Sequence, residues 1–239
     1  MERVIHRATG RGVVDQGWLK SYHTFSYGNY YDPRRIHFGA LRILNDNTIE
    51  GGEGHGSHTH DNMEIITIPL EGALEHGDNI GNISVLSAGE IQVLTAGTGI
   101  VHNEYNKSQT SPVRFFQIWI YPGEYELQPA YSQIDMPELK PDELTMIVAP
   151  YGEDNGPVAH ISQQAWLYVV EFTGGGASVT HTPHTGNYGT YIFVVEGEVS
   201  VGQTTLNSGD GMGIWETDSI VISSGAPSKV LLIEVPMKK

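Results

Sequence analysis

The chain has 239 residues, 29 glycines, no cysteine and a formal net charge of −15. It is long enough for one large β domain or two small ones, and without cysteine it offers neither disulfides nor thiolate metal ligands. Because only 13 residues are Lys or Arg, so acidic a chain is a poor partner for phosphate backbones or anionic membranes. We expect neither nucleic acid nor a membrane as partner.

The N-terminal residues carry no apolar run of the kind that a signal peptide needs. Nowhere do eighteen apolar residues follow one another, so no membrane-spanning helix is expected. Together with the absence of cysteine, which is consistent with a reducing compartment, this predicts a cytoplasmic protein.

Residues 4–31 are rich in aromatic side chains and show no clear period, and they are best taken as core and inter-domain packing. After them the sequence predicts short strands between Gly, Asn and Ser breaks, with a polar turn at 45–47. The strands expected in the first half are 36–44, 64–70, 73–76, 81–86, 90–94 and 113–121. No segment before residue 130 has a sustained helical period, so helix content should be low.

The polar segment 136–145, with two prolines four residues apart, is the predicted solvated linker between an N-terminal domain of residues 1–135 and a C-terminal domain of residues 146–239. Strands then resume at 145–148, 165–173, 191–195, 198–201, 211–214, 219–223 and 229–235. The second half echoes the turn sequences of the first at an offset of about 120 to 125 residues, which indicates a duplicated β-barrel.

Two stretches of the first half hold side chains suited to a metal ion. His58 and His60 lie two residues apart and so point the same way on an extended strand, as do His102 and Glu104. Glu64 has the same parity as the first pair. If the two strands face each other across a barrel, four or five nitrogen and oxygen donors converge on one interior point, which suits a divalent metal.

The spacing of these residues resembles known motifs. The pattern Gly52-x5-His58-x-His60-x3-Glu64 fits the first motif of the cupin superfamily, and Gly99-x2-His102-x3-Asn106 fits the end of the second, with Gly97 in place of its usual proline. More closely, the N-terminal half resembles the pirin family. The segments that carry this resemblance are SYHTFS (21–26), YYDP (30–33), HTHDNMEIIT (58–67), LEGALEH (70–76) and TAGTGIVHNE (95–104).

The resemblance implies an all-β bicupin, two Greek-key or jelly-roll β-barrels packed side by side, with one metal in the N-terminal barrel and none in the C-terminal one. The pirin-type ligands map onto His58, His60, His102 and Glu104, whereas the general cupin scheme makes Glu64 a ligand. We favour Glu104, because it shares a strand face with His102 at the shortest same-face spacing. Glu64 then lies beside the site or in the pocket wall.

The bacterial pirins that these motifs resemble act as quercetin 2,3-dioxygenases. This implies a metal-dependent oxidoreductase that binds a flavonol or similar aromatic enol, cleaves it with O2 and releases carbon monoxide, with Glu104 or Glu64 as general base. Iron is the first candidate for the ion, and histidine and carboxylate ligands also suit Cu, Ni, Mn, Co and Zn. The alternative is a non-catalytic metal-binding regulator or transcriptional cofactor that acts through protein partners.

The remaining histidines give weaker signals. We expect His76 to line the pocket or lie on the surface, and the signals from His23 and His37 are weaker still. His181 and His184 are three residues apart, which would put them on opposite faces of a strand, and they are expected in a solvated loop.

Overall fold

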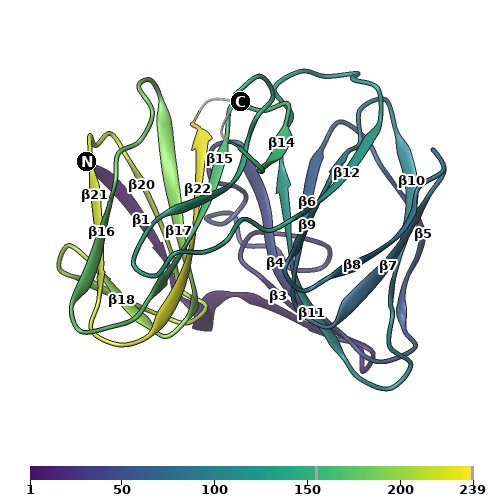
Figure 1. Cartoon of the computed structure of the whole chain (residues 1–239), viewed down its shortest axis with the longest axis horizontal. Coiled ribbons are helices and arrows are strands. Elements are labelled where there is room, and N and C mark those ends of the chain that lie inside the picture. The colour runs from purple at the N-terminus through teal and green to yellow at the C-terminus, as the bar shows by residue number, and fades with distance from the viewer. Residues whose placement is uncertain (154–155, 238–239) are drawn as a thin grey trace.

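Two jelly rolls lie side by side in the computed structural model, which describes residues 1–153 and 156–237 (Figure 1). Each is built from one seven-stranded and one four-stranded sheet. In the described residues the only helix is the three-residue 3-10 turn η1 (Ala8–Gly10). The predicted all-β fold with low helix content is confirmed.

The N-terminal jelly roll carries the predicted metal motif on its smaller sheet. Its large sheet has the order β12 (Ala130–Asp135), β9 (Glu90–Thr95), β6 (Glu64–Glu71), β11 (Val113–Ile120), β4 (Leu41–Ile49), β3 (Leu19–His23) and β2 (Gly12–Asp15). Its small sheet has the order β5 (Gly54–His60), β10 (Ile100–Asn106), β7 (Ala73–Asp78) and β8 (Ile83–Ser87). All neighbours in both sheets are antiparallel.

The C-terminal jelly roll repeats this arrangement. Its large sheet has the order β1 (Glu2–His6), β20 (Gly211–Trp215), β17 (Tyr188–Glu196), β22 (Ser228–Pro236), β15 (Trp166–Phe172), β13 (Thr145–Pro150) and β14 (Ala159–Ile161). Its small sheet has the order β16 (Ala177–His181), β21 (Ile220–Ser224), β18 (Glu198–Val201) and β19 (Thr204–Asn207). The echo seen in the sequence is a shared turn: Gly72 and Gly197 end β6 and β17 with φ of 76° and 79°, a region that favours glycine.

A shared apolar core joins the two halves, because the large sheets pack against each other. The cluster takes Ile66, Phe116 and Ile118 from the N-terminal large sheet and Phe193 and Leu231 from the C-terminal one. Alternate residues of these strands face this core, while the residues between them face the interior of their own jelly roll. This core therefore supports the large sheet of the jelly roll whose small sheet carries the candidate site.

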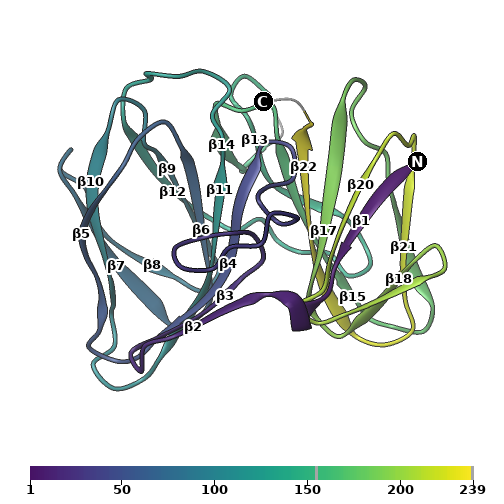
Figure 2. The same ribbon diagram turned by 180° about the vertical axis from the view of Figure 1, so that it is seen from behind.

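The strand β1 belongs by pairing to the C-terminal jelly roll, although it lies in the sequence range predicted for the first domain. Its residues pair with β20 from Glu2 opposite Trp215 to His6 opposite Gly211. The chain then crosses to the other half through η1 and β2 (Figure 2). Pairing between segments about 210 residues apart leaves no local signal, and the sequence showed none.

The predicted turn at 45–47 is wrong, because β4 runs through it. Asn45 and Asn47 are buried on the inner face of the sheet, and Asp46 accepts two hydrogen bonds from Arg114 at 3.0 Å. The three polar residues resemble a turn in sequence but are part of a strand, because Asn45 and Asn47 face a polar layer of the interior while Asp46 pairs with Arg114 on the other face. The predicted strand 36–44 is displaced accordingly to Leu41–Ile49.

Residues 136–144 form no strand, and Met136 and Leu139 pack against the apolar cluster shared by the two halves. The segment thus covers part of the interface between the jelly rolls. The placement of the domain boundary there remains a prediction.

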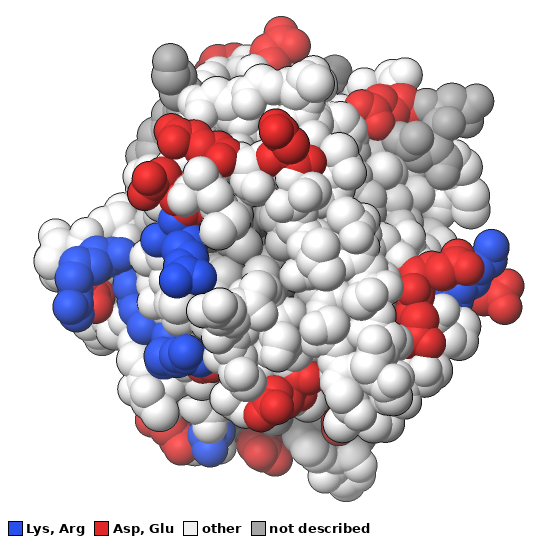
Figure 3. All heavy atoms as spheres, turned by 90° about the vertical axis from the view of Figure 1, so that its left-hand side faces the viewer, with Lys and Arg blue, Asp and Glu red and all other residues white. Residues whose placement is uncertain are grey.

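Charged side chains are unevenly distributed over the face shown in Figure 3, where Lys and Arg gather toward one margin while Asp and Glu are scattered more widely. Within residues 1–153 and 156–237, no helix has the length and apolar character that crossing a membrane requires.

His6 should make the metal-free protein lose stability as the pH falls. It is buried, its Nδ1 lies 2.9 Å from the Tyr191 hydroxyl, and burial followed by the charge of Arg35 lowers its pKa to about 4. Between pH 6.5 and about 4 the unfolded chain therefore binds a proton that folded His6 resists. We expect the free energy of unfolding to fall by up to about 1.4 kcal/mol per pH unit from this residue alone.

Urea unfolding of the wild-type protein and of His6→Asn at about pH 7 and about pH 5 measures this contribution. The variant should lose less stability between the two pH values than the wild type. Identical losses in both proteins would show that His6 does not carry the effect.

Candidate metal centre

Three histidines meet because β5 and β10 are neighbours in the small sheet. His102 pairs directly with His58, and His60 pairs with Ile100. The strands therefore lie side by side, and the expectation that they face each other across a barrel is wrong. The ligand nitrogens of His58, His60 and His102 all lie within 4.8 Å of one another. In the part of the chain that the structure describes, no other group of three such side chains is this close.

Two of the three histidines, His60 and His102, are held as neutral imidazoles, the form that binds metals. Burial, and then the neighbouring His58, lowers the pKa of His60 to about 4 and that of His102 to about 2. Three buried ring nitrogens have no hydrogen-bond partner among the described protein atoms: His60 Nε2 and both nitrogens of His102. His58 Nδ1 donates to the Gly56 carbonyl at 2.8 Å, which leaves its Nε2 lone pair available. These donors fit a divalent transition metal.

Glu104 is buried next to this group but is not a member of it. The pairing of β10 with β5 shifts by one residue after His102, so that Glu104 lies opposite His55. Its Oε2 accepts a hydrogen bond from Gln117 Nε2 at 2.9 Å. Burial raises the pKa of Glu104, against the opposing effect of His58 and of the Gln117 bond. The carboxylate therefore holds a proton more readily than an exposed one.

Glu64 is directed toward the C-terminal half. It is fully buried, its Oε2 accepts from Thr95 Oγ1 at 2.7 Å, and its Oε1 accepts from the Ser162 amide at 3.0 Å and from the Ser162 hydroxyl. Ser162 lies 98 residues further along the chain. Both oxygens are thus engaged, Oε2 within the N-terminal jelly roll and Oε1 in a contact between the two halves, which parity alone did not indicate.

His76 lies closer to the histidines than the sequence suggested. It is buried on β7, where it pairs with Glu104, and its ring centroid is 5.4 Å from that of His102. Its Nε2 lies 3.0 Å from Asp78 Oδ2, and its Nδ1 has no partner among the described atoms. Asp78 thereby orients a ring that packs beside the centre.

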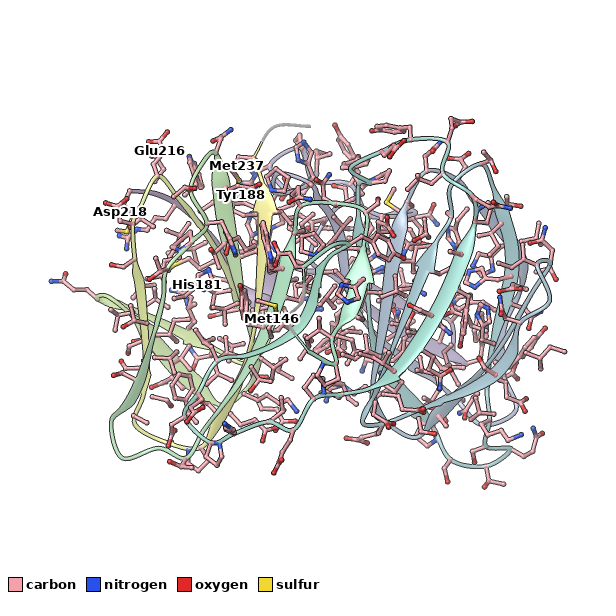
Figure 4. All side chains as sticks on the ribbon, turned by 45° about the horizontal axis from the view of Figure 1, so that its top comes forward. Met146, His181, Tyr188, Glu216, Asp218 and Met237 are labelled. Atoms are coloured by element: carbon pink, nitrogen blue, oxygen red, sulfur yellow. The ribbon has the colours of Figure 1, made fainter. Side chains whose placement is uncertain are left out.

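The prediction of a solvated loop is wrong for His181. This residue ends β16 opposite Ile220, the position that His60 holds opposite Ile100 in the other jelly roll (Figure 4). Only 4% of it is exposed, and its Nε2 lies 2.9 Å from Oε2 of the fully buried Glu234. A buried carboxylate needs a partner of opposite charge or a hydrogen-bond donor, and His181 provides one.

His184 contacts the same carboxylate from the following loop. Its Nδ1 and its amide lie 3.0 and 2.7 Å from Glu234 Oε1, and its ring stacks on Trp166 at 3.6 Å. At the position equivalent to His60 of the first jelly roll, the second jelly roll therefore has a cluster of two histidines and a carboxylate.

Two tandem jelly rolls, one with a buried histidine group, define a bicupin. A family model described as Pirin matches residues 4–120, and one described as the quercetinase C-terminal cupin domain matches residues 146–235. The chain belongs to the pirin family, which confirms the resemblance seen in the sequence.

Known proteins match this chain over its whole length. A relative named quercetin 2,3-dioxygenase from Escherichia coli strain K12 is 39% identical over 232 residues, which cover 97% of this chain and 98% of that protein. The crystal structure of YhhW from Escherichia coli covers 100% of both chains with a TM-score of 0.92 and 36% identity. The structure of bacterial pirin YhhW in complex with nickel(II) has a TM-score of 0.91, 37% identity and coverage of 98% and 99%.

Replacement of His60 or His102 by Ala should remove most of the bound metal, because each change deletes one ligand of the group. Elemental analysis of the purified variants measures this. His160→Ala, whose ring stacks on Tyr151 in the C-terminal half, is the matched control and should retain the wild-type metal content. A full equivalent of metal in both site variants would refute the centre.

Glu64→Gln should retain the metal and lose stability. The change removes the charge from hydrogen bonds to Thr95 and Ser162, each worth about 1.5–3 kcal/mol. Denaturant unfolding of Glu64→Gln, Ser162→Ala and the double variant gives the coupling between the two residues. Loss of metal from a folded Glu64→Gln variant would instead place Glu64 at the centre.

Proposed function

We propose that this protein is a metal-dependent dioxygenase that cleaves a flavonol such as quercetin with O2 and releases carbon monoxide. The observation that carries the proposal is the group of three close histidines, two of which have buried ring nitrogens without a partner among the described atoms. It is supported by the full-length relative named quercetin 2,3-dioxygenase, with 39% identity.

The proposed ligands are His58, His60, His102 and Glu104, around one divalent ion. Three nitrogens and one carboxylate leave open positions on a five- or six-coordinate ion, as a catalytic centre needs. Iron is our first candidate from the sequence. Nickel is the ion in the structure of the related bacterial pirin, and the same donors suit it.

When bound, the ion supplies a positive charge that lowers the pKa of an enolic hydroxyl placed against it. The chain's own contribution is proton transfer and orientation. Because burial raises the pKa of Glu104, this carboxylate is a better acceptor for the proton of the flavonol 3-hydroxyl. Gln117 holds Oε2, so Oε1 is the oxygen left to bind the ion and then to accept the proton.

In this proposal Glu64 is not the general base, although the sequence made it a candidate for that role. Because Thr95 and Ser162 occupy both of its oxygens, we assign the general base to Glu104 alone. Glu64 then holds the end of β6 against the C-terminal half and acts on the reaction only through the position of that strand.

Aerobic incubation with quercetin tests the proposed function. Protein reconstituted separately with iron, copper, nickel, manganese or cobalt is followed by loss of the flavonol absorbance and by release of carbon monoxide. We expect turnover with at least one ion, and a loss of about a hundredfold or more in kcat for Glu104→Gln, since a positioned base contributes on that order. No turnover with any of the five ions would favour the non-catalytic regulator instead.

A further inference from the structure

A row of polar side chains crosses the inner face of the large sheet of the N-terminal jelly roll. His23 on β3 pairs with Asn45 on β4, Asn45 with Gln117 on β11, and Gln117 with Thr67 on β6. Residues paired directly across antiparallel strands share a face, so the four side chains lie side by side. All four are buried. Gln117 connects the row to the metal centre through its bond to Glu104.

Apolar clusters flank this row on both sides along the strands. One includes Leu19, Ile49 and Phe115, and the other includes Ile65 and Leu94. The interior is therefore layered, with a polar layer between two apolar ones. A polar layer in this position costs stability unless its hydrogen bonds are satisfied.

Several atoms of the row are not satisfied within the protein. His23 Nδ1, Asn45 Oδ1 and Thr67 Oγ1 are buried and have no hydrogen-bond partner among the described atoms. Each such atom costs about 1–3 kcal/mol when it is left without a partner. In contrast, Asn47, the next inward-facing residue of β4, accepts a bond from Ser21 at 2.5 Å. The unpaired atoms are therefore placed for a partner from outside the chain.

A cavity of about 310 Å³ lies against His23, Asn45 and Gln117. This volume is at the lower end of the range for small-molecule sites, about 300–1,000 Å³. The cavity is also lined by Trp18, Tyr27 and His55. The Trp18 and His55 rings meet edge to face at 5.2 Å, as do the Tyr27 and His23 rings. Aromatic walls with a polar floor suit a planar ring that bears hydroxyl groups.

The cavity adjoins the candidate centre at two points. Gln117 both lines it and donates to Glu104. His55 lines it as well, and its ring centroid is 6.1 Å from that of His58. A ligand that reaches the ion with one ring can thus place a second ring in this cavity.

We propose that the cavity binds the hydroxylated second ring of the substrate, and that Asn45 and His23 determine specificity for two adjacent ring hydroxyls. Asn45 Oδ1 accepts a hydrogen bond from one hydroxyl, and His23 Nδ1 pairs with its neighbour. The inference rests on the proposed function, from which the flavonol skeleton is taken. It adds which hydroxyl pattern on the second ring the protein selects.

The test compares quercetin, which carries two adjacent hydroxyls on this ring, with galangin, which carries none. Dissociation constants are measured without oxygen on nickel-loaded protein, so that binding is read without turnover. The wild type should bind quercetin more tightly than galangin. Asn45→Leu should reduce the ratio of the galangin Kd to the quercetin Kd about tenfold or more, since a lost buried hydrogen bond has this effect. His23→Phe should also reduce this ratio.

Controls separate recognition from folding. Asn45→Leu replaces an amide whose Oδ1 has no protein partner by an apolar group of similar size, so the stability to urea should be kept. If this variant does not fold, His23→Phe decides the outcome. Thr190→Val is the matched control, because Thr190 Oγ1 is also buried without a partner but lies in the other jelly roll. It should leave the ratio unchanged.

Either of two binding results overturns the inference: an unchanged ratio in folded Asn45→Leu and His23→Phe, or equal binding of both flavonols by the wild type. Turnover of both flavonols with equal kcat/KM in every variant would also overturn it while the proposed function stands. Selective binding that the variants abolish, with no turnover of either flavonol, supports the inference and removes the proposed function.

Discussion

The pairing of β10 with the edge strand β5 holds the candidate centre together. Its register puts His102 opposite His58, and the shift after His102 moves Glu104 opposite His55, beside the histidines but outside their group. The neighbouring β7 adds His76 from the other side of β10. Three adjacent strands of one sheet thus supply nearly all the chemistry, so the geometry depends on backbone hydrogen bonds rather than on loops.

Burial of so many polar groups is compatible with folding because the apolar contacts lie elsewhere. The large sheets of the two halves meet over an extended apolar cluster, whereas the interior of the first jelly roll is divided into polar and apolar layers. The same burial keeps His60 and His102 uncharged and raises the proton affinity of Glu104. The main apolar contacts between the halves therefore lie on the outer face of the large sheet, whereas the reactive groups lie on the small sheet of the same jelly roll.

Local patterns in the sequence predicted the all-β fold, the duplication and the three histidines, because residue parity and glycine turns act over short distances. What they missed depends on distant partners. Glu64 meets Ser162, and His181 meets Glu234, through contacts that no spacing encodes. The turn expected at Asn45 failed for a related reason: a run of polar residues predicts exposure to solvent only when the whole interior is apolar, and here the interior contains a polar layer.

The position of β1 has a consequence for synthesis. Glu2 pairs with Trp215, so the edge of the C-terminal sheet is completed by residues that leave the ribosome long before their partner exists. At about 5–20 residues per second, β1 waits roughly 10 to 40 seconds for β20. During that interval the N-terminal jelly roll can form around its metal ligands, while a short strand stays outside it. The last step of folding then ties the start of the chain to the second half.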